Sequence, residues 1–108
     1  MRTPEDVLRE AFEADRQRQE GLKILREKQG AADEAKNALK TAEATALLNV
    51  QGTVPEKQAQ VVLACQAERE AAAAAEAEIH YVKETLRQLS DRISLLQSEL
   101  RWMRELGA

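Results

Sequence analysis

The sequence predicts an all-α protein, an antiparallel two-helix coiled-coil hairpin that assembles into a helical-bundle oligomer. Residues 79–103 carry apolar side chains at alternating steps of three and four, which is the repeat of a coiled coil. Hydrophobic residues make up 44% of the chain, many of them alanine, whereas 3% are aromatic and 32% are charged. This composition is typical of long helices. One stretch of turn residues around Gly52 divides the 108 residues into two halves of similar length.

The first helix is predicted over about residues 4–49. Thr3 is a favourable cap, Pro4 suits the first turn, and the acids that follow face the positive end of the helix dipole. The positions four residues after Leu25 and then at steps of seven hold the polar residues Gln29, Lys36 and Glu43, so we expect the apolar stripe to drift or to contain a stutter. Gly30 is a possible kink, which leaves a three-helix arrangement open. The stripe is predicted to contain Leu8, Ala11 or Phe12, Leu22, Leu25, Ala32, Ala35, Leu39, Ala42 and Ala46.

A turn is predicted over residues 50–53, followed by a second helix over about residues 54–105. Gly52 can adopt the left-handed conformation that ends a helix. Thr53 and Glu56 have the spacing of a capping box, which favours a helix start at this point. Because the connection is short, we expect the two helices to be antiparallel neighbours in a single domain, residues 1–108.

The apolar stripe of the second helix, here called the seam, is predicted to be an oligomer interface. Residues 4–27 of the first helix offer too few apolar side chains to cover so regular a stripe. We therefore expect a second copy of the chain to complete the burial, in a dimer of hairpins or a larger helical ring. The seam consists of Ile79, Val82, Leu86, Leu89, Ile93, Leu96, Leu100 and Met103.

Three large side chains share one heptad position beside the seam: Tyr81, Leu95 and Trp102. A hairpin alone would leave them exposed. We expect them to pack on the partner hairpin, and the alternative is an aromatic surface for a ligand such as a nucleic-acid base.

No catalytic constellation is recognisable, so the chain is not expected to be an enzyme. A single histidine, His80, and a single cysteine, Cys65, cannot form an ordinary metal site, and Cys65 is expected to be a small core residue. We predict no metal, no cofactor and no small-molecule substrate. With no long apolar run and no recognisable signal peptide, no membrane association is expected, and the expected location is cytoplasmic.

The basic residues suggest a possible contact strip for the phosphates of a nucleic acid. The alternative interpretation of these basic residues is an ordinary solvated surface. The formal net charge of −3 excludes neither interpretation. The candidate contacts are Arg16, Arg18, Lys23, Arg26, Lys28 and Arg87.

Three segments of the second half resemble small helical phage proteins that accompany single-strand annealing or recombination genes. They are the run from Gly52 to Ala59, the run Ala75-Glu76-Ala77-Glu78 with Val82-Lys83, and the run from Ile93 to Arg101. The characterised group to which the chain is most similar is the UvsY-like recombination mediators.

The resemblance implies a non-enzymatic helical oligomer in the cytoplasm of a phage host. Such a protein would bind single-stranded DNA and a recombinase or a single-strand-binding protein. The alternative function is that of a structural or adaptor coiled coil, such as a virion assembly factor or a small chaperone, with a protein partner and no DNA binding.

Overall fold

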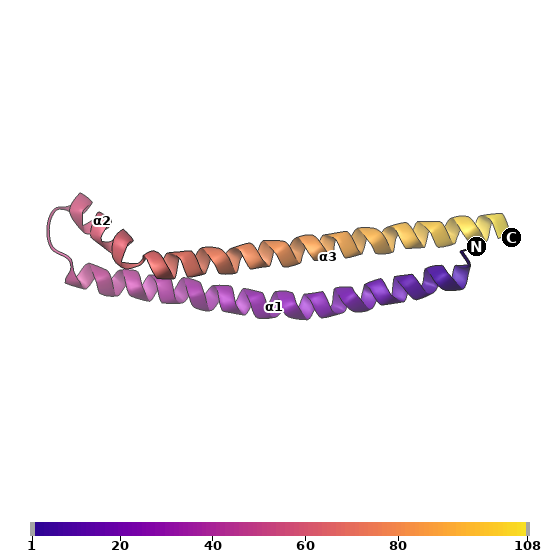
Figure 1. Cartoon of the computed structure of the whole chain (residues 1–108), viewed down its shortest axis with the longest axis horizontal. Coiled ribbons are helices and arrows are strands. Elements are labelled where there is room, and N and C mark those ends of the chain that lie inside the picture. The colour runs from indigo at the N-terminus through magenta and orange to yellow at the C-terminus, as the bar shows by residue number, and fades with distance from the viewer. Residues whose placement is uncertain (1, 108) are drawn as a thin grey trace. The chain divides into compact units, whose positions relative to one another are not determined.

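The computed structural model describes residues 2–107, and the chain is all-helical (Figure 1). Helix α1 spans Pro4–Asn49, α2 spans Val54–Ala64 and α3 spans Gln66–Gly107. The contacts of the chain divide it into two compact units. Unit 1 contains residues 2–25 and 81–107, and unit 2 contains residues 26–80. Helices α1 and α3 each contribute to both units.

Local interactions set the helix starts, as the sequence predicted. The Thr3 hydroxyl accepts a hydrogen bond from the backbone N–H of Asp6 at 3.2 Å, and the Thr3 N–H donates to the Asp6 carboxylate at 3.0 Å. Thr53 and Glu56 form a capping box at the start of α2. Gly52 has φ of 123°, a conformation that side chains of L-amino acids rarely adopt. The turn residues therefore end α1 and begin α2.

Helix α1 is continuous through Gly30, so the kink considered there is absent. The break lies instead at Cys65, which separates α2 from α3 and has φ of −107° and ψ of 18°. Its N–H still donates to the Val61 carbonyl at 3.0 Å. Cys65 is 1% exposed, as expected of a core residue, and Val61 is also buried. The single helix predicted over residues 54–105 is therefore two helices.

Unit 1 pairs the beginning of α1 with the end of α3 in antiparallel directions (Figure 1). Arg2 forms an ion pair with Glu99, Glu10 lies 3.8 Å from Arg92, and Gly21 faces Leu86. Residue numbers therefore rise along α1 as they fall along α3. Close approach depends on Gly21, since a Cβ atom at this position would lie 2.6 Å from Leu86 Cδ2.

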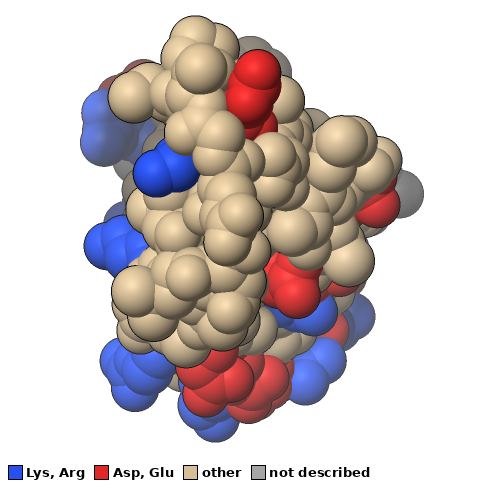
Figure 2. All heavy atoms as spheres, turned by 90° about the vertical axis from the view of Figure 1, so that its left-hand side faces the viewer, with Lys and Arg blue, Asp and Glu red and all other residues tan. Residues whose placement is uncertain are grey.

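Unit 2 pairs the remainder of α1 with α2 and the start of α3. Three ion pairs join its long helices, from Lys28 to Glu78 at 2.9 Å, from Lys36 to Glu76 at 3.2 Å, and from Glu43 to Arg69 at 3.4 Å. This pairing is also antiparallel. The end that carries the loop and α2 has mostly uncharged side chains on its near face (Figure 2). Exposed apolar residues in this part of the chain include Leu47, Leu48, Val54 and Leu63.

The buried stripe of α1 contains the predicted residues from Leu25 to Ala46, but it differs from the predicted stripe before Leu25. Its residues alternate strictly at steps of four and three, so the expected drift or stutter is absent. Packing selects small side chains and two cations, whereas Leu8, Phe12 and Leu22 of the predicted stripe are exposed. The buried or half-buried residues at these steps are Val7, Ala11, Ala14, Arg18, Gly21, Leu25, Lys28, Ala32, Ala35, Leu39, Ala42 and Ala46.

Candidate functional site

All eight residues of the predicted seam are buried or half-buried in the described chain. Only Ile79 and Leu96 are fully buried; the other six, Val82, Leu86, Leu89, Ile93, Leu100 and Met103, are intermediate. In unit 1, grooves between α1 and α3 are lined by seam residues, which places the seam against α1. Its partial burial follows from the small side chains that α1 presents to it.

The other three predicted interface residues remain exposed on α3. Tyr81 is 75% exposed, Leu95 is 72% exposed and Trp102 is 61% exposed. With Gln88 between them, they form a line of residues seven apart that we call the Tyr81 row. Because a helix has 3.6 residues per turn, residues seven apart lie along one side of it.

A groove of about 380 Å³ lies beside the Tyr81 row in unit 1. Tyr81, Val82 and Leu86 line it from α3, and Gly21 and Ile24 line it from α1. The groove extends the exposed apolar surface from the Tyr81 row towards α1.

The predicted phosphate contacts are mostly neutralised by carboxylates within the described chain. Only Arg26 has no ion pair there. The hydrogen bonds from Arg16 lower the pKa of Glu13, and those from Arg87 lower the pKa of Glu84. Such paired cations are poorer contacts for phosphate than free ones. The pairs are Arg16–Glu13 at 2.6 Å, Arg18–Asp15 at 2.6 Å, Lys23–Glu20 at 3.5 Å, Lys28–Glu78 at 2.9 Å, and Arg87 with Glu84.

A row of seven residues, four of them basic and three polar but uncharged, lies along α3 on another side of the helix from the Tyr81 row. These residues follow one another at alternating steps of four and three, and all are exposed. None is acidic, and within residues 2–107 only Arg87 forms an ion pair. We call this set the basic row, and it consists of Lys83, Arg87, Ser90, Ser94, Gln97, Arg101 and Arg104. Grouping the charged residues of 81–107 by heptad position would have found it from the sequence.

Phe12 lies on the same flank of unit 1 as the basic row. It lines a second groove of about 380 Å³ together with Gln97 of the basic row, and its side chain is 72% exposed. On the other side of the basic row, at the next heptad position of α3, are Glu84, Asp91 and Glu105. The basic row is therefore a narrow strip between carboxylates and an apolar groove.

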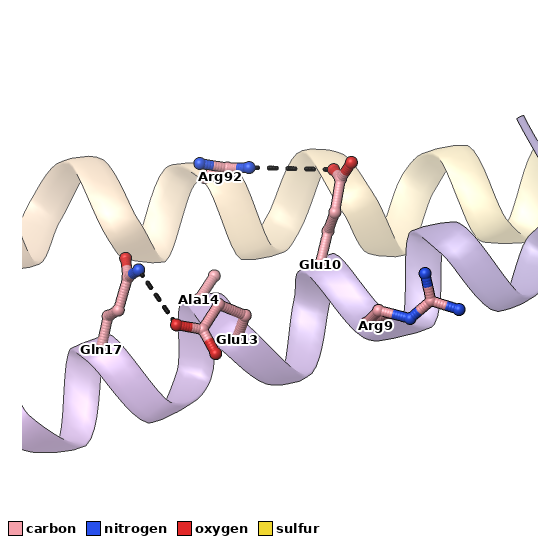
Figure 3. A pocket seen from close by; sticks show the side chains of 6 residues that line it. All are labelled: Arg9, Glu10, Glu13, Ala14, Gln17 and Arg92. Atoms are coloured by element: carbon pink, nitrogen blue, oxygen red, sulfur yellow. Dashed lines mark hydrogen bonds and ion pairs between the residues drawn. The ribbon is translucent and has the colours of Figure 1, made fainter.

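A third groove, of about 240 Å³ and lined mostly by polar residues, lies on the same flank of unit 1 as the groove beside the Tyr81 row, and Gln17 lines both (Figure 3). Arg92 reaches from α3 towards Glu10, and the Gln17 amide donates to the Glu13 carboxylate at 3.3 Å. Arg2 also binds Glu10 and lowers its pKa, which keeps this carboxyl ionised. General acid–base catalysis is most efficient when the pKa of the group lies near the working pH, whereas the pKa values of Glu10 and Glu13 are lowered by their arginine partners.

The remaining titratable residues do not converge. Within residues 2–107, no group of three or more His, Cys, Asp or Glu side chains is placed to hold a metal ion. His80 is exposed, and Cys65 is buried. Across the same residues, no helix has an apolar stretch long enough to cross a membrane. The surfaces that distinguish this chain are therefore the Tyr81 row and the basic row.

Comparison with known proteins found no match to the chain among protein-family models, curated proteins or solved structures.

Proposed function

We propose that the protein is a non-enzymatic, self-associating coiled coil with a structural or adaptor role, in which α1 and α2–α3 form one antiparallel hairpin. The exposed Tyr81 row carries this proposal. Large apolar side chains exposed along one side of a helix favour an interaction site, because their exposure to water is unfavourable. Other copies of the chain are always present in solution, so self-association requires no other protein.

The charge distribution favours self-association through unit 1. This unit contains ten acidic and ten basic side chains, so the net charge of the chain resides in unit 2. Two copies of a neutral unit do not repel each other through their net charge. The proposal therefore requires no additional ligand to neutralise the interface.

Light scattering across a range of protein concentrations tests self-association. We expect a mass above that of one chain, falling on dilution, and a fluorescence shift to shorter wavelength as Trp102, the only tryptophan, becomes covered. Leu95→Glu should produce monomers because it places a charge in the Tyr81 row. Ser90→Glu is the matched control, since it adds the same charge at an exposed position on another side of α3 from the Tyr81 row. A monomeric wild-type protein at all concentrations would overturn the proposal.

A second candidate function is binding of single-stranded nucleic acid along the basic row. From residue 83 to residue 104 this row is about 32 Å long at 1.5 Å per residue. Lys83, Arg101 and Arg104 lack ion pairs within the described chain, and Phe12 provides an exposed ring for base stacking. The carboxylates that border the row favour a narrow strand over a broad anionic surface. The more specific role in phage recombination, with a recombinase or single-strand-binding protein as partner, stays a prediction from the resemblance.

Titration of a labelled single-stranded oligonucleotide at several salt concentrations tests this candidate. We expect binding that weakens with salt, and loss of one phosphate contact in Arg101→Gln should reduce the slope of log K against log salt by about 1. Arg16→Gln is the control, because Arg16 already pairs with Glu13. Absence of binding at low salt would exclude nucleic acid as a ligand. Equal effects of the two substitutions would exclude the basic row as the site.

A further inference from the structure

We infer that a second copy of the chain packs on the Tyr81 row in parallel, so that each residue of the row meets its own counterpart across a two-fold axis. This inference rests on the proposed self-association and specifies its surface and direction. It follows from the exposed area, the charges that border the row, and the polar residue at its centre.

The exposed apolar area is close to what a stable dimer requires. At about 150–250 Å² per aromatic side chain, Tyr81 and Trp102 retain together roughly 200–340 Å² of exposed surface. Leu95 and Leu106, 72% and 68% exposed, add about 80–170 Å². A standard interface buries about 800 Å² per partner, of which some 450–520 Å² is apolar. The Tyr81 row and Leu106 thus supply more than half of that apolar share.

The charged residues beside the row favour a parallel arrangement. One neighbouring heptad position of α3 carries Glu84, Asp91 and Glu105, and the other carries Arg92 together with Glu99, which pairs with Arg2 within the chain. In a parallel pair, the heptad position of Asp91 in one copy faces the heptad position of Arg92 in the second copy. Asp91 is therefore brought towards Arg92 of the second copy. In an antiparallel pair the acidic sides face each other. Facing like charges are unfavourable, so the parallel pair is preferred.

Gln88 favours the same direction because it occupies an inner position of the row. In a parallel pair the two Gln88 side chains meet, and an amide can both donate to and accept from another amide. In a fully overlapping antiparallel pair, Gln88 faces Leu95, which offers no hydrogen-bond partner. A single polar residue within an apolar helix interface is known to select register and direction in this way.

Cross-linking of single cysteine variants distinguishes the two directions. In a Cys65→Ala background, Gln88→Cys should form a disulfide-linked dimer under mild oxidation, or a cross-linked dimer with a short bismaleimide reagent. In the antiparallel pair the two Cα atoms at position 88 are displaced by seven residues, about 10 Å, which exceeds the reach of a disulfide. Ser94→Cys is the matched control, because Ser94 belongs to the basic row on another side of the helix.

Circular dichroism would verify that each variant is folded, and light scattering under reducing conditions would verify that it associates. Association with efficient cross-linking at position 88 and little at position 94 is the expected result. Association without preferential cross-linking at position 88 would overturn the parallel pairing while leaving self-association intact. A folded monomer would overturn both.

Discussion

Gly21 and Gly30 occupy the same helix in very different surroundings. A Cβ atom at Gly21 would lie 2.6 Å from Leu86 Cδ2, whereas one at Gly30 would meet no atom within 4 Å. Both glycines reduce helix propensity, because glycine has more conformational freedom to lose than alanine. Only Gly21 therefore offers a packing advantage in return for this cost.

We predict that Gly30→Ala raises the free energy of unfolding by about 1 kcal/mol, the gain in helix propensity. Gly21→Ala should gain less or lose stability, because Leu86 must move to admit the new methyl group. Urea unfolding followed by circular dichroism measures both. Equal stabilisation by the two substitutions would show that α1 and α3 do not approach closely at Gly21.

The cap at Thr3 makes stability depend on pH. The Thr3 backbone N–H, and to a lesser extent its hydroxyl, lower the pKa of Asp6 below its ordinary value of 3.8. A carboxyl group whose pKa is lower in the folded state stabilises the fold above its unfolded pKa. This contribution is lost as the pH falls through the folded pKa.

We therefore predict that the melting temperature falls on acidification below about pH 4, near and below the ordinary pKa of Asp6. Asp6→Asn should lower it at neutral pH and reduce the further loss on acidification. Part of the acid sensitivity should remain, because Glu10, Glu13 and Glu84 also have lowered pKa values. Thermal melts at a series of pH values would measure this, and an unchanged pH profile in Asp6→Asn would contradict the assignment.

At the scale of elements, α3 presents large seam residues and α1 presents small ones. Leu95 and Leu96 are chemically identical neighbours, but Leu96 is 5% exposed and Leu95 is 72% exposed. Removing buried methyl groups costs the transfer free energy and leaves a cavity, whereas removing exposed ones costs neither in the monomer. Substitutions of Leu95 and Leu96 therefore separate the effect on folding from the effect on association.

Leu96→Ala should lower the free energy of unfolding by about 2–5 kcal/mol. Leu95→Ala should change it by less than about 0.5 kcal/mol when measured at a concentration low enough to keep the protein monomeric. At high concentration, Leu95→Ala should instead lower the oligomer fraction seen by light scattering. Equal losses at low concentration would mean that both side chains are buried in the monomer.

At the scale of the whole molecule, the two units differ in the apolar side chains they bury. In unit 1, α3 buries the large seam residues from Val82 to Met103, whereas in unit 2 the half-buried residues of α3 beside Ile79 include Glu68, Ala72 and Ala75. Smaller side chains remove less apolar surface from water, so they stabilise helix pairing less. Unit 2 is expected to open at a lower free energy than unit 1.

Native-state hydrogen exchange measures this difference. Amides of residues 35–46 and 66–76 should exchange faster than those of residues 7–21 and 86–100 at the same pH and temperature. A substitution that enlarges a side chain in unit 2, such as Ala75→Leu, is unsuitable as a control because added volume can strain a close contact. The control is the series of pH values used for Asp6→Asn, because acid perturbs the start of α1, which lies in unit 1. Equal protection throughout would show that the units open together.

Residue patterns were sufficient to predict the helix starts and the seam of α3. Thr3, Gly52, Thr53 and Glu56 act through hydrogen bonds and backbone conformations within a few residues, so their effect is readable without the remainder of the chain. The break at Cys65 lies outside this class. Neither glycine nor proline occurs beside it, so no local signal marked it.

The residues predicted to contact a partner also divide into those that a local pattern identifies and those that only the folded chain identifies. The Tyr81 row was predicted as a surface from its heptad spacing, and the structure places it in exposed positions. The expected phosphate contacts were chosen by local charge density, but their carboxylate partners were not considered. Arg16 and Arg18 bind acids three residues earlier in α1, whereas Lys28 binds Glu78, which is distant in sequence. The last of these pairs could be found only from the folded chain.

The sequence by itself determined that the chain is helical, where α1 begins and ends, and which face of α3 is buried, because short-range hydrogen bonds and a strict apolar repeat encode these features. From Leu25 to Ala46 the predicted face of α1 is also the buried one, whereas only the tertiary structure decided which face of α1 is buried before Leu25. Val7, Ala14 and Gly21 lie inward while Phe12 is exposed, because close approach to the large α3 side chains favours small residues over the most apolar ones. That choice leaves the α3 seam only partly covered.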